Sequence, residues 1–172
     1  YAGDAVAALA QLDIPKAVFV GTSMGGLIAM IVAATKGDLV EGAILNDIGP
    51  VIDPRGIARI AGYAGNTGPF PHWRACAAQI EALQGAFYPD ADEAFWLTFA
   101  RRCAKEMASG HIVFDYDPAI SKGMGGAAPP PGALMPLFQA LAAKPVLVVR
   151  GALSDILSTD GVAAMKAANP DL

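Results

Sequence analysis

Residues 17–30 read AVFVGTSMGGLIAM, and the fold that the sequence predicts depends on this stretch. The apolar run 17–20 ends abruptly in a glycine, as a short buried strand does, and the alanine-rich run 27–34 is typical of a helix. Ser23 stands between them, at the centre of G-x-S-x-G. A serine on such a strand-to-helix turn projects its hydroxyl clear of the sheet, so the pattern predicts a nucleophile.

The glycines of this turn and the helix after it have separate physical roles. The turn brings the residues two before and two after Ser23 together, so we expect Gly21 and Gly25 to avoid a collision of side chains. Backbone N–H groups at the start of the helix point toward the serine and can stabilise a negatively charged carbonyl oxygen. The N–H of Met24 is therefore the expected first oxyanion donor. The pentapeptide alone leaves an ordinary glycine-rich turn open, whereas the absence of G-x-x-x-x-G-K-[ST] excludes a P-loop.

Composition narrows the class of protein. The chain has 172 residues, 54% of them hydrophobic, which is enough for a sizeable core. A net charge of −4 without a basic run argues against nucleic acid as a partner, and no apolar stretch is long enough to predict a membrane span. Cys76 and Cys103 lack metal-site spacing, and with two histidines in the chain we expect no metal. No secretion signal is visible, so the expected location is cytoplasmic.

The order of the expected elements predicts an α/β fold. We expect helices at 1–12, from 27 to about 36, and at 133–142 and 159–168, and buried strands at 17–20, 40–45 and 145–150. A strand–helix–strand rhythm implies parallel strands joined by right-handed crossovers. The sequence therefore predicts a parallel sheet with helices packed on it.

Residues 51–131 interrupt this rhythm. We expect helices at 55–63, 72–83 and 92–107, an extended return segment at 110–118, and an irregular Gly/Pro-rich loop at 123–132. The predicted organisation is thus a first core segment at 1–50, a helical insertion with its return loop at 51–131, and a second core segment at 132–172. Aromatic residues are frequent in the insertion, and either ordinary helix packing or a cap lining an apolar substrate pocket accounts for them. The candidate pocket residues are Trp73, Trp96 and Phe99.

Three chemistry-bearing residues directly follow the three expected strands. They are Ser23, Asp47 and Asp155. Ligands of open parallel sheets bind outside the carboxyl ends of the strands, so these residues are expected at one edge. A serine nucleophile needs a base to take its proton and a carboxylate to orient that base.

GTSMGG after a strand, LNDIGP at a second strand end and PVLVVRGALSD at a third resemble the α/β-hydrolase superfamily, in particular its esterase- or lactonase-like members with a helical cap. The resemblance implies a partial hydrolase core with a cap insertion. It assigns Ser23 as nucleophile, Asp155 as triad acid and the Met24 N–H as an oxyanion donor. Asp47 occupies a strand end where some relatives place the acid, so it is the alternative acid. Its simpler interpretation is a turn-forming aspartate that caps local N–H groups.

The sequence departs from the superfamily pattern at the base. The family's histidine follows the acid, whereas His72 and His111 both precede Asp155 and are expected to be surface or cap residues. The first half of the family's sheet, with its second oxyanion donor, is also missing. We therefore expect the sequence to be the central part of a longer protein, with the base histidine beyond Leu172, and residues 1–172 alone to be inactive.

The resemblance implies a serine hydrolase that acts on a small, fairly apolar carboxylic ester or lactone through an acyl-enzyme on Ser23. It implies no metal or organic cofactor and a small-molecule substrate as the partner; the oligomeric state stays open. A cofactor-free perhydrolase or a hydrolase of carbon–carbon bonds would use the same triad. A non-catalytic hydrolase scaffold that binds a ligand or a partner is the alternative from another class.

Overall fold

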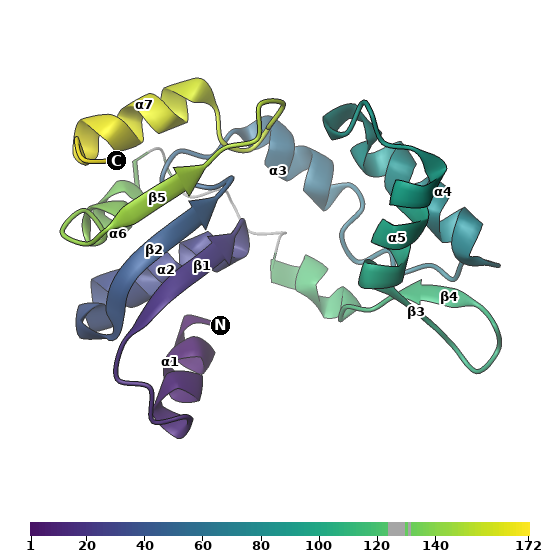
Figure 1. Cartoon of the computed structure of the whole chain (residues 1–172), viewed down its shortest axis with the longest axis horizontal. Coiled ribbons are helices and arrows are strands. Elements are labelled where there is room, and N and C mark those ends of the chain that lie inside the picture. The colour runs from purple at the N-terminus through teal and green to yellow at the C-terminus, as the bar shows by residue number, and fades with distance from the viewer. Residues whose placement is uncertain (124–129, 131) are drawn as a thin grey trace. The chain divides into compact units, whose positions relative to one another are not determined.

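A computed structural model describes residues 1–123, 130 and 132–172 of the chain (Figure 1). The chain divides into two compact units. Unit 1 comprises Tyr1–Ala58 and Ala127–Leu172, and unit 2 comprises Arg59–Gly126. Most of the irregular loop predicted at 123–132 lies outside the described residues.

Unit 1 is built on a parallel sheet. Among the described residues its strands lie in the order β1 (Ala17–Thr22), β2 (Val40–Asn46) and β5 (Val146–Val149). Val20 lies opposite Ile44, and Ile44 lies opposite Leu147. The order and register confirm the predicted α/β fold with a partial parallel sheet.

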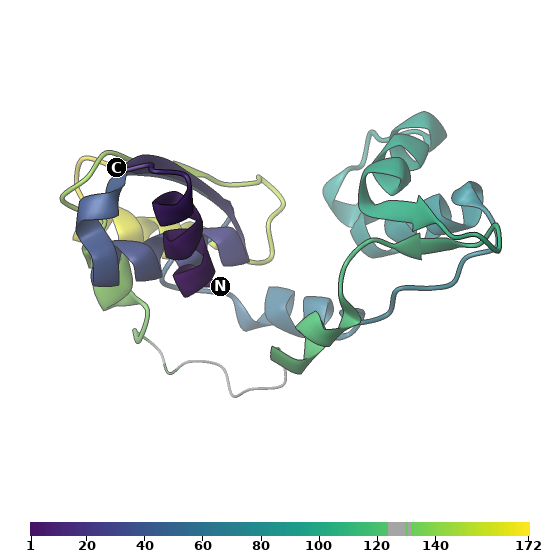
Figure 2. The same ribbon diagram turned by 90° about the horizontal axis from the view of Figure 1, so that it is seen from below.

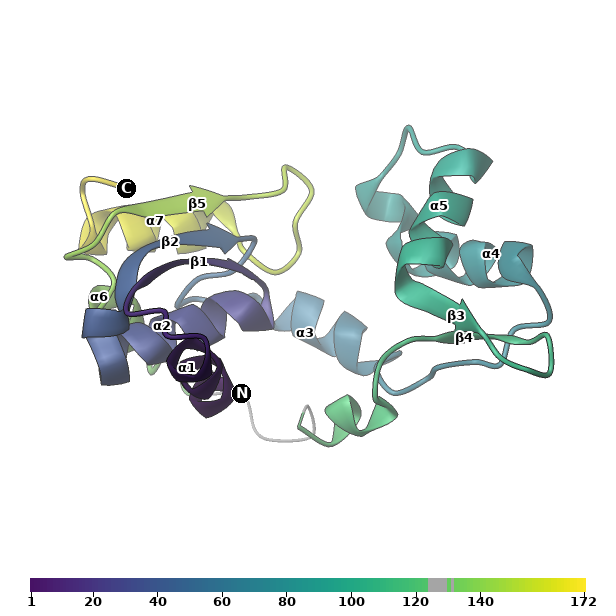
Figure 3. The same cartoon turned by 60° about the horizontal axis from the view of Figure 1, so that its bottom comes forward.

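One face of this sheet carries the core of unit 1. The helices of the unit are α1 (Ala2–Gln11), α2 (Met24–Lys36), α6 (Met135–Gln139) and α7 (Thr159–Ala168), with the short 3₁₀ turn η1 (Gly37–Leu39) before β2. Figures 2 and 3 show α1 and α2 on the same side of the sheet. Leu45 of β2, Met30 of α2, Phe138 of α6 and Met165 of α7 belong to one core cluster and are inaccessible to solvent.

The opposite face of the sheet is apolar and exposed. Alternate residues of a strand point to opposite faces, and the outward residues of β1 and β5 are valines and a leucine, with Thr22 at the end of β1. Their exposed fractions are 55% for Val18, 71% for Val20, 55% for Leu147 and 45% for Val149. Parallel strands with this composition are usually covered on both faces. The described residues of unit 1 leave this face open.

Unit 2 is a helical unit with a two-stranded antiparallel ribbon. It contains α4 (Trp73–Gln84), η2 (Gly85–Phe87), α5 (Glu93–Cys103), β3 (Ala104–Glu106), β4 (Ile112–Phe114) and η3 (Pro118–Gly123); α3 (Pro54–Ala61) spans its boundary with unit 1. Helices α4 and α5 pack against each other (Figure 1). In the part of unit 2 that the structure describes, the buried core consists of Cys76, Ala77, Ile80, Trp96, Ala100 and Ile112.

The predicted helix 92–107 is four residues too long. It ends at Cys103, and β3 continues the chain by pairing antiparallel with β4. The backbone groups of 104–106 thus find their partners in the return segment rather than in a further helical turn. The extended conformation predicted for that segment is confirmed at Ile112–Phe114.

In the part of the chain that the structure describes, no helix is both long enough and apolar enough to cross a membrane. No group of three or more His, Cys, Asp and Glu side chains in the same part of the chain could hold a metal ion.

Candidate active site

Ser23 occupies a sharp turn between β1 and α2. Its backbone angles are φ 49° and ψ −116°, which L-residues rarely adopt, and it is the N-terminal cap residue of α2. The Ser23 N–H donates to the carbonyl oxygen of Asn46 at 3.1 Å, which fixes the turn to the end of β2. Such a conformation costs about 1–3 kcal/mol and persists only where the surrounding structure enforces it. The predicted strand–turn–helix context of the serine is therefore present.

Two glycines make the turn sterically feasible, and one of them differs from the prediction. A Cβ at Gly21 would overlap the backbone of Gly25 and Gly26, so Gly21 is needed as expected. A Cβ at Gly25 would meet no atom within 4 Å, so the expected collision at this position is wrong. The second constrained position is Gly26, whose Cβ would overlap the Ile48 side chain. The sequence could have indicated Gly26 only through the double glycine, because Ile48 is distant along the chain.

Met24 is the first residue of α2. The N–H groups of the first turn have no acceptor inside the helix, and the helix dipole places partial positive charge there. The Met24 N–H, adjacent to Ser23, can therefore donate to an oxyanion formed at the serine. Its side chain is 41% exposed and is not required for this role.

The sheet register brings the three strand ends to one edge. Thr22 lies opposite Asn46, and Asn46 lies opposite Val149, so the residues that follow these positions are neighbours. Ser23 follows β1, Asp47 follows β2, and the loop bearing Asp155 follows β5. Asn46 Nδ2 also donates to Thr22 Oγ1 at 3.1 Å beside the serine.

Asp47 is held by the loop after β5. Its Oδ1 accepts from the Gly151 N–H at 3.1 Å and its Oδ2 accepts from the Ser154 hydroxyl at 2.6 Å. Its backbone has φ 55°, a left-handed conformation that aspartate tolerates. The side chain thus caps N–H and O–H groups more than 100 positions away along the chain rather than local ones. Ser154 was not among the predicted site residues.

Asp155 lies half-buried in the loop between β5 and α7. The start of α3 packs against this loop, because a Cβ at Gly56 would overlap the Asp155 carbonyl oxygen. Arg55 is nearby: hydrogen bonding to Asp53, with a smaller electrostatic contribution from Asp155, raises the pKa of the Arg55 guanidinium. Asp155 is thus an acidic residue in a closely packed loop at the same sheet edge as Ser23.

The predicted pocket aromatics all lie in unit 2. Trp96 is 2% exposed and belongs to the core of that unit, which favours its packing role. Trp73 is half-buried, donates from Nε1 to Glu106 at 3.2 Å and has the Arg101 guanidinium 4.8 Å from its ring centre. Phe99 is half-buried, with its ring centre 6.2 Å from that of Trp96.

The two histidines also lie in unit 2. His72 is the N-terminal cap of α4, where its Nδ1 accepts from the Ala75 N–H at 3.1 Å. His111 is exposed, with its Nδ1 3.2 Å from the Ser109 hydroxyl. His72 is exposed and caps the N-terminus of α4, in agreement with the expectation of a surface residue.

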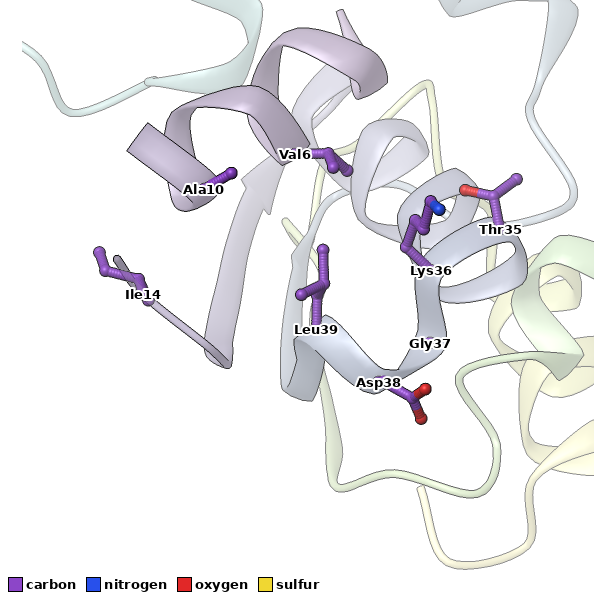
Figure 4. Close-up of a pocket in the computed structure, with 8 residues that line it drawn as sticks. All are labelled: Val6, Ala10, Ile14, Thr35, Lys36, Gly37, Asp38 and Leu39. Carbon is purple, nitrogen blue, oxygen red and sulfur yellow. The ribbon is translucent and has the colours of Figure 1, made fainter. Parts of the chain in front are cut away.

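A cavity of unit 1 lies away from Ser23. Figure 4 shows this cavity of about 590 Å³ between α1 and the turn that follows α2. Of its lining residues, Leu39 directly precedes β2 and Ile14 lies three positions before the start of β1. The cavity is therefore at the amino ends of the strands, whereas Ser23 and Asp47 are at their carboxyl ends.

The fold and the strand-end residues define a class of protein. The sequence matches the alpha/beta hydrolase family over residues 1–170. The chain belongs to this family.

Individual relatives agree with that assignment. The chain is 32% identical to a 3-hydroxybutyrate-oligomer hydrolase from Cupriavidus necator, over 97% of this chain and 59% of the relative. It is 42% identical to an alpha/beta hydrolase from Novosphingobium aromaticivorans, with a TM-score of 0.89 over 99% of this chain and 60% of that one. An esterase from Mycobacterium tuberculosis is 25% identical, with a TM-score of 0.65 over 97% of this chain and 54% of that one. The chain spans less than two thirds of the length of these relatives.

Proposed function

We propose that the protein to which these residues belong is a serine hydrolase that cleaves carboxylic esters through an acyl-enzyme on Ser23. The strained backbone of Ser23, between β1 and the N-terminus of α2, is the observation that carries the proposal. A plain strand-to-helix connection has no need of a non-glycine residue at φ 49° and ψ −116°. Strain of this kind is found at functional sites, where it aims a side chain.

The chemistry assigns a role to each residue at the sheet edge. A base takes the Ser23 hydroxyl proton as Oγ forms a bond to the substrate carbonyl carbon, and the Met24 N–H stabilises the resulting oxyanion. The intermediate expels the alcohol, which receives that proton, and water then hydrolyses the acyl-enzyme to the acid. Asp155 orients the base. We assign the base to a histidine outside residues 1–172, in the part of the relatives' length that this chain does not span.

The preferred substrate class is a small, fairly apolar ester or lactone. The name of the Cupriavidus relative, a hydrolase of 3-hydroxybutyrate oligomers, makes short oligomers of hydroxy acids the first substrates to test. We propose that Trp73 and Phe99, both half-buried, contribute apolar surface to the substrate pocket. Trp96 supports that surface by packing within unit 2.

The test uses the full-length protein. A fluorophosphonate probe should form an adduct on Ser23, located by mass spectrometry, and Ser23→Ala should lose the adduct and about 10⁶-fold in kcat. The substrate panel comprises 3-hydroxybutyrate oligomers, short-chain nitrophenyl esters and lactones, with peracid formation as a separate assay. Absence of an adduct on a folded full-length protein would overturn the proposal and favour a ligand-binding scaffold.

A further inference from the structure

Asp47 connects the end of the central strand to the loop after β5. It follows Asn46, the last residue of β2, and its N–H donates to the Val149 carbonyl oxygen at 2.7 Å. Its carboxylate then accepts from Gly151 N–H at 3.1 Å and from the Ser154 hydroxyl at 2.6 Å. Main chain and side chain of one residue thus hold the beginning of the loop at two points.

Ser154 links Asp47 by hydrogen bonds to the residues on either side of Asp155. Its Oγ accepts from the N–H groups of Ile156 and Leu157, each at 3.1 Å, while its hydroxyl proton is donated to Asp47. Asp155 lies between Ser154 and Ile156, so its backbone is closed within a small hydrogen-bonded ring. A residue inside such a ring loses freedom in φ and ψ, and this restricts the directions in which its side chain can point.

Two further contacts hold the loop from outside. The Asp53 N–H donates to the Ile156 carbonyl oxygen at 2.8 Å, and Arg150 Nε donates to the Leu157 carbonyl oxygen at 2.7 Å. These bonds hold residues 156 and 157 but do not reach Ser154. The segment immediately before Asp155 is held by a main-chain bond from the Ser154 N–H to the Gly151 carbonyl oxygen at 3.0 Å and by the side-chain bonds of Asp47 and Ser154.

We infer that Asp47 and Ser154 are positioning residues that hold Asp155 in the geometry needed to orient the catalytic base. This inference rests on the proposed function, in which Asp155 is the triad acid. It separates the two carboxylates that the sequence left as alternatives: Asp155 orients the base, and Asp47 orients Asp155.

The donor and acceptor roles of Ser154 and Asp47 make the inference testable. Ser154 Oγ already accepts two hydrogen bonds, so its partner at position 47 must be an acceptor. In Asp47→Asn, an amide oxygen can serve only one of the two donors, Gly151 N–H or the Ser154 hydroxyl, and the NH₂ group faces the other. The substitution keeps the size of the side chain but breaks the arrangement.

Four substitutions in the full-length enzyme test the inference: Asp47→Asn, Ser154→Ala, Ser154→Thr and the control Asp13→Asn. Asp13 is an exposed aspartate with φ 52°, the same backbone class as Asp47, at the amino ends of the strands. We expect Asp47→Asn and Ser154→Ala to lower kcat by about 100-fold, the cost of about 1 Å of misplacement, with a smaller change in KM. Ser154→Thr, which keeps the hydroxyl, should restore most of the activity, and Asp13→Asn should match the wild type.

A pH profile separates positioning from general destabilisation. A well-oriented carboxylate raises the pKa of the base, so a displaced Asp155 should move the acid limb of kcat/KM to lower pH. We expect this shift in Asp47→Asn and Ser154→Ala and its absence in Asp13→Asn. If Asp47→Asn does not fold, the pair Ser154→Ala and Ser154→Thr carries the comparison, because both keep Asp47.

Two results would overturn the inference. Wild-type kcat and pH profile in Ser154→Ala, with severe loss in Asp47→Asn, would make Asp47 the triad acid itself. Wild-type behaviour of both variants would leave the pair without a role in positioning. The proposed function is tested separately by Asp155→Asn, which should cost about 10⁴-fold in kcat; if that variant is fully active, the acid assignment fails rather than the positioning argument alone.

Discussion

The Ser23 turn of unit 1 is stabilised by main-chain contacts, whereas the core cluster of unit 2 around Trp96 is stabilised by side-chain packing. At the turn, the critical atoms belong to the backbone: Gly21 lies against the main chain of Gly25 and Gly26, and the Ser23 N–H bonds to Asn46. In the cluster, a single large side chain fills the space between two helices. The stability of unit 1 should therefore fall when one carbon atom is added at the turn, and that of unit 2 when a large side chain is removed from its core.

The largest expected effect is at Gly21. In Gly21→Ala the new methyl group would overlap backbone that cannot move without opening the turn, so we expect a loss of at least about 3 kcal/mol in stability or no folded protein. Gly25→Ala is the matched control, because its Cβ meets open space and alanine favours a helix by up to about 1 kcal/mol. Urea unfolding of both variants measures the difference. Equal destabilisation would contradict the backbone argument.

The counterpart in unit 2 is Trp96. Trp96→Ala removes a side chain that is 2% exposed and should cost about 3–5 kcal/mol. Its neighbour Phe95 is 37% exposed with its ring centre 5.0 Å from that of Trp96, so Phe95→Ala should cost much less. Hydrogen exchange in the peptides covering α4 and α5 gives the comparison. A Phe95→Ala variant as unstable as Trp96→Ala would show that the surface ring contributes as much as the buried one.

Helix caps should act alike in the two units, because they depend only on local geometry. The Asp92 carboxylate accepts from Phe95 N–H at 2.8 Å at the start of α5, and Ser158 Oγ accepts from Gly161 N–H at 3.0 Å at the start of α7. Asp92→Ala and Ser158→Ala should each cost about 1 kcal/mol. The measurement is the change in hydrogen-exchange protection of α5 and α7 respectively. Asp90→Ala, at an exposed position before the α5 cap, is the control and should stay within about 0.5 kcal/mol of the wild type.

The sequence predicted those parts of unit 1 that depend on local patterns. The bounds of α7 were predicted to the residue, and β1 and β2 to within two residues at their ends, because apolar periodicity and glycine punctuation determine them. The contacts of Asp47 with Gly151 and Ser154 were not predicted, since they join residues more than 100 positions apart. The role of Gly26 was missed for the same reason: it depends on Ile48, which reaches the turn only once β2 is in place.

In unit 2 the predicted end of the helix 92–107 was wrong for another physical reason. The stretch 101–107, RRCAKEM, favours a helix at almost every position, yet the helix ends at Cys103 and residues 104–106 form a strand. Pairing with β4 satisfies that backbone and packs the buried Ile112 against the helices. A tertiary contact outweighs a modest local preference here, and no residue in the stretch signals the change.

The smallest expected effect concerns the start of α3, where an ion pair tests how much a surface charge contributes beside the Asp155 loop. Asp53 accepts from the Arg55 N–H at 2.9 Å and from its guanidinium at 2.6 Å, and these bonds lower the pKa of the carboxyl from 3.8 to about 2. The folded state therefore favours ionised Asp53. Its contribution to stability is present above pH 3.8 and is lost as the pH falls toward 2.

Asp53→Asn should flatten the dependence of the urea midpoint on pH between about pH 5 and pH 2. Arg55→Met should flatten it in part, because the backbone N–H of residue 55 still donates to Asp53. Arg55 is 81% exposed, so salt at about 1 M, where the screening length is about 3 Å, should reduce the difference between wild type and both variants. A wild-type pH dependence in Arg55→Met would assign the lowered pKa to the backbone N–H alone. In that case a hydrogen bond from the main chain fixes the start of α3, as the Ser23 N–H does at the Ser23 turn, and the guanidinium charge of Arg55 adds nothing to it.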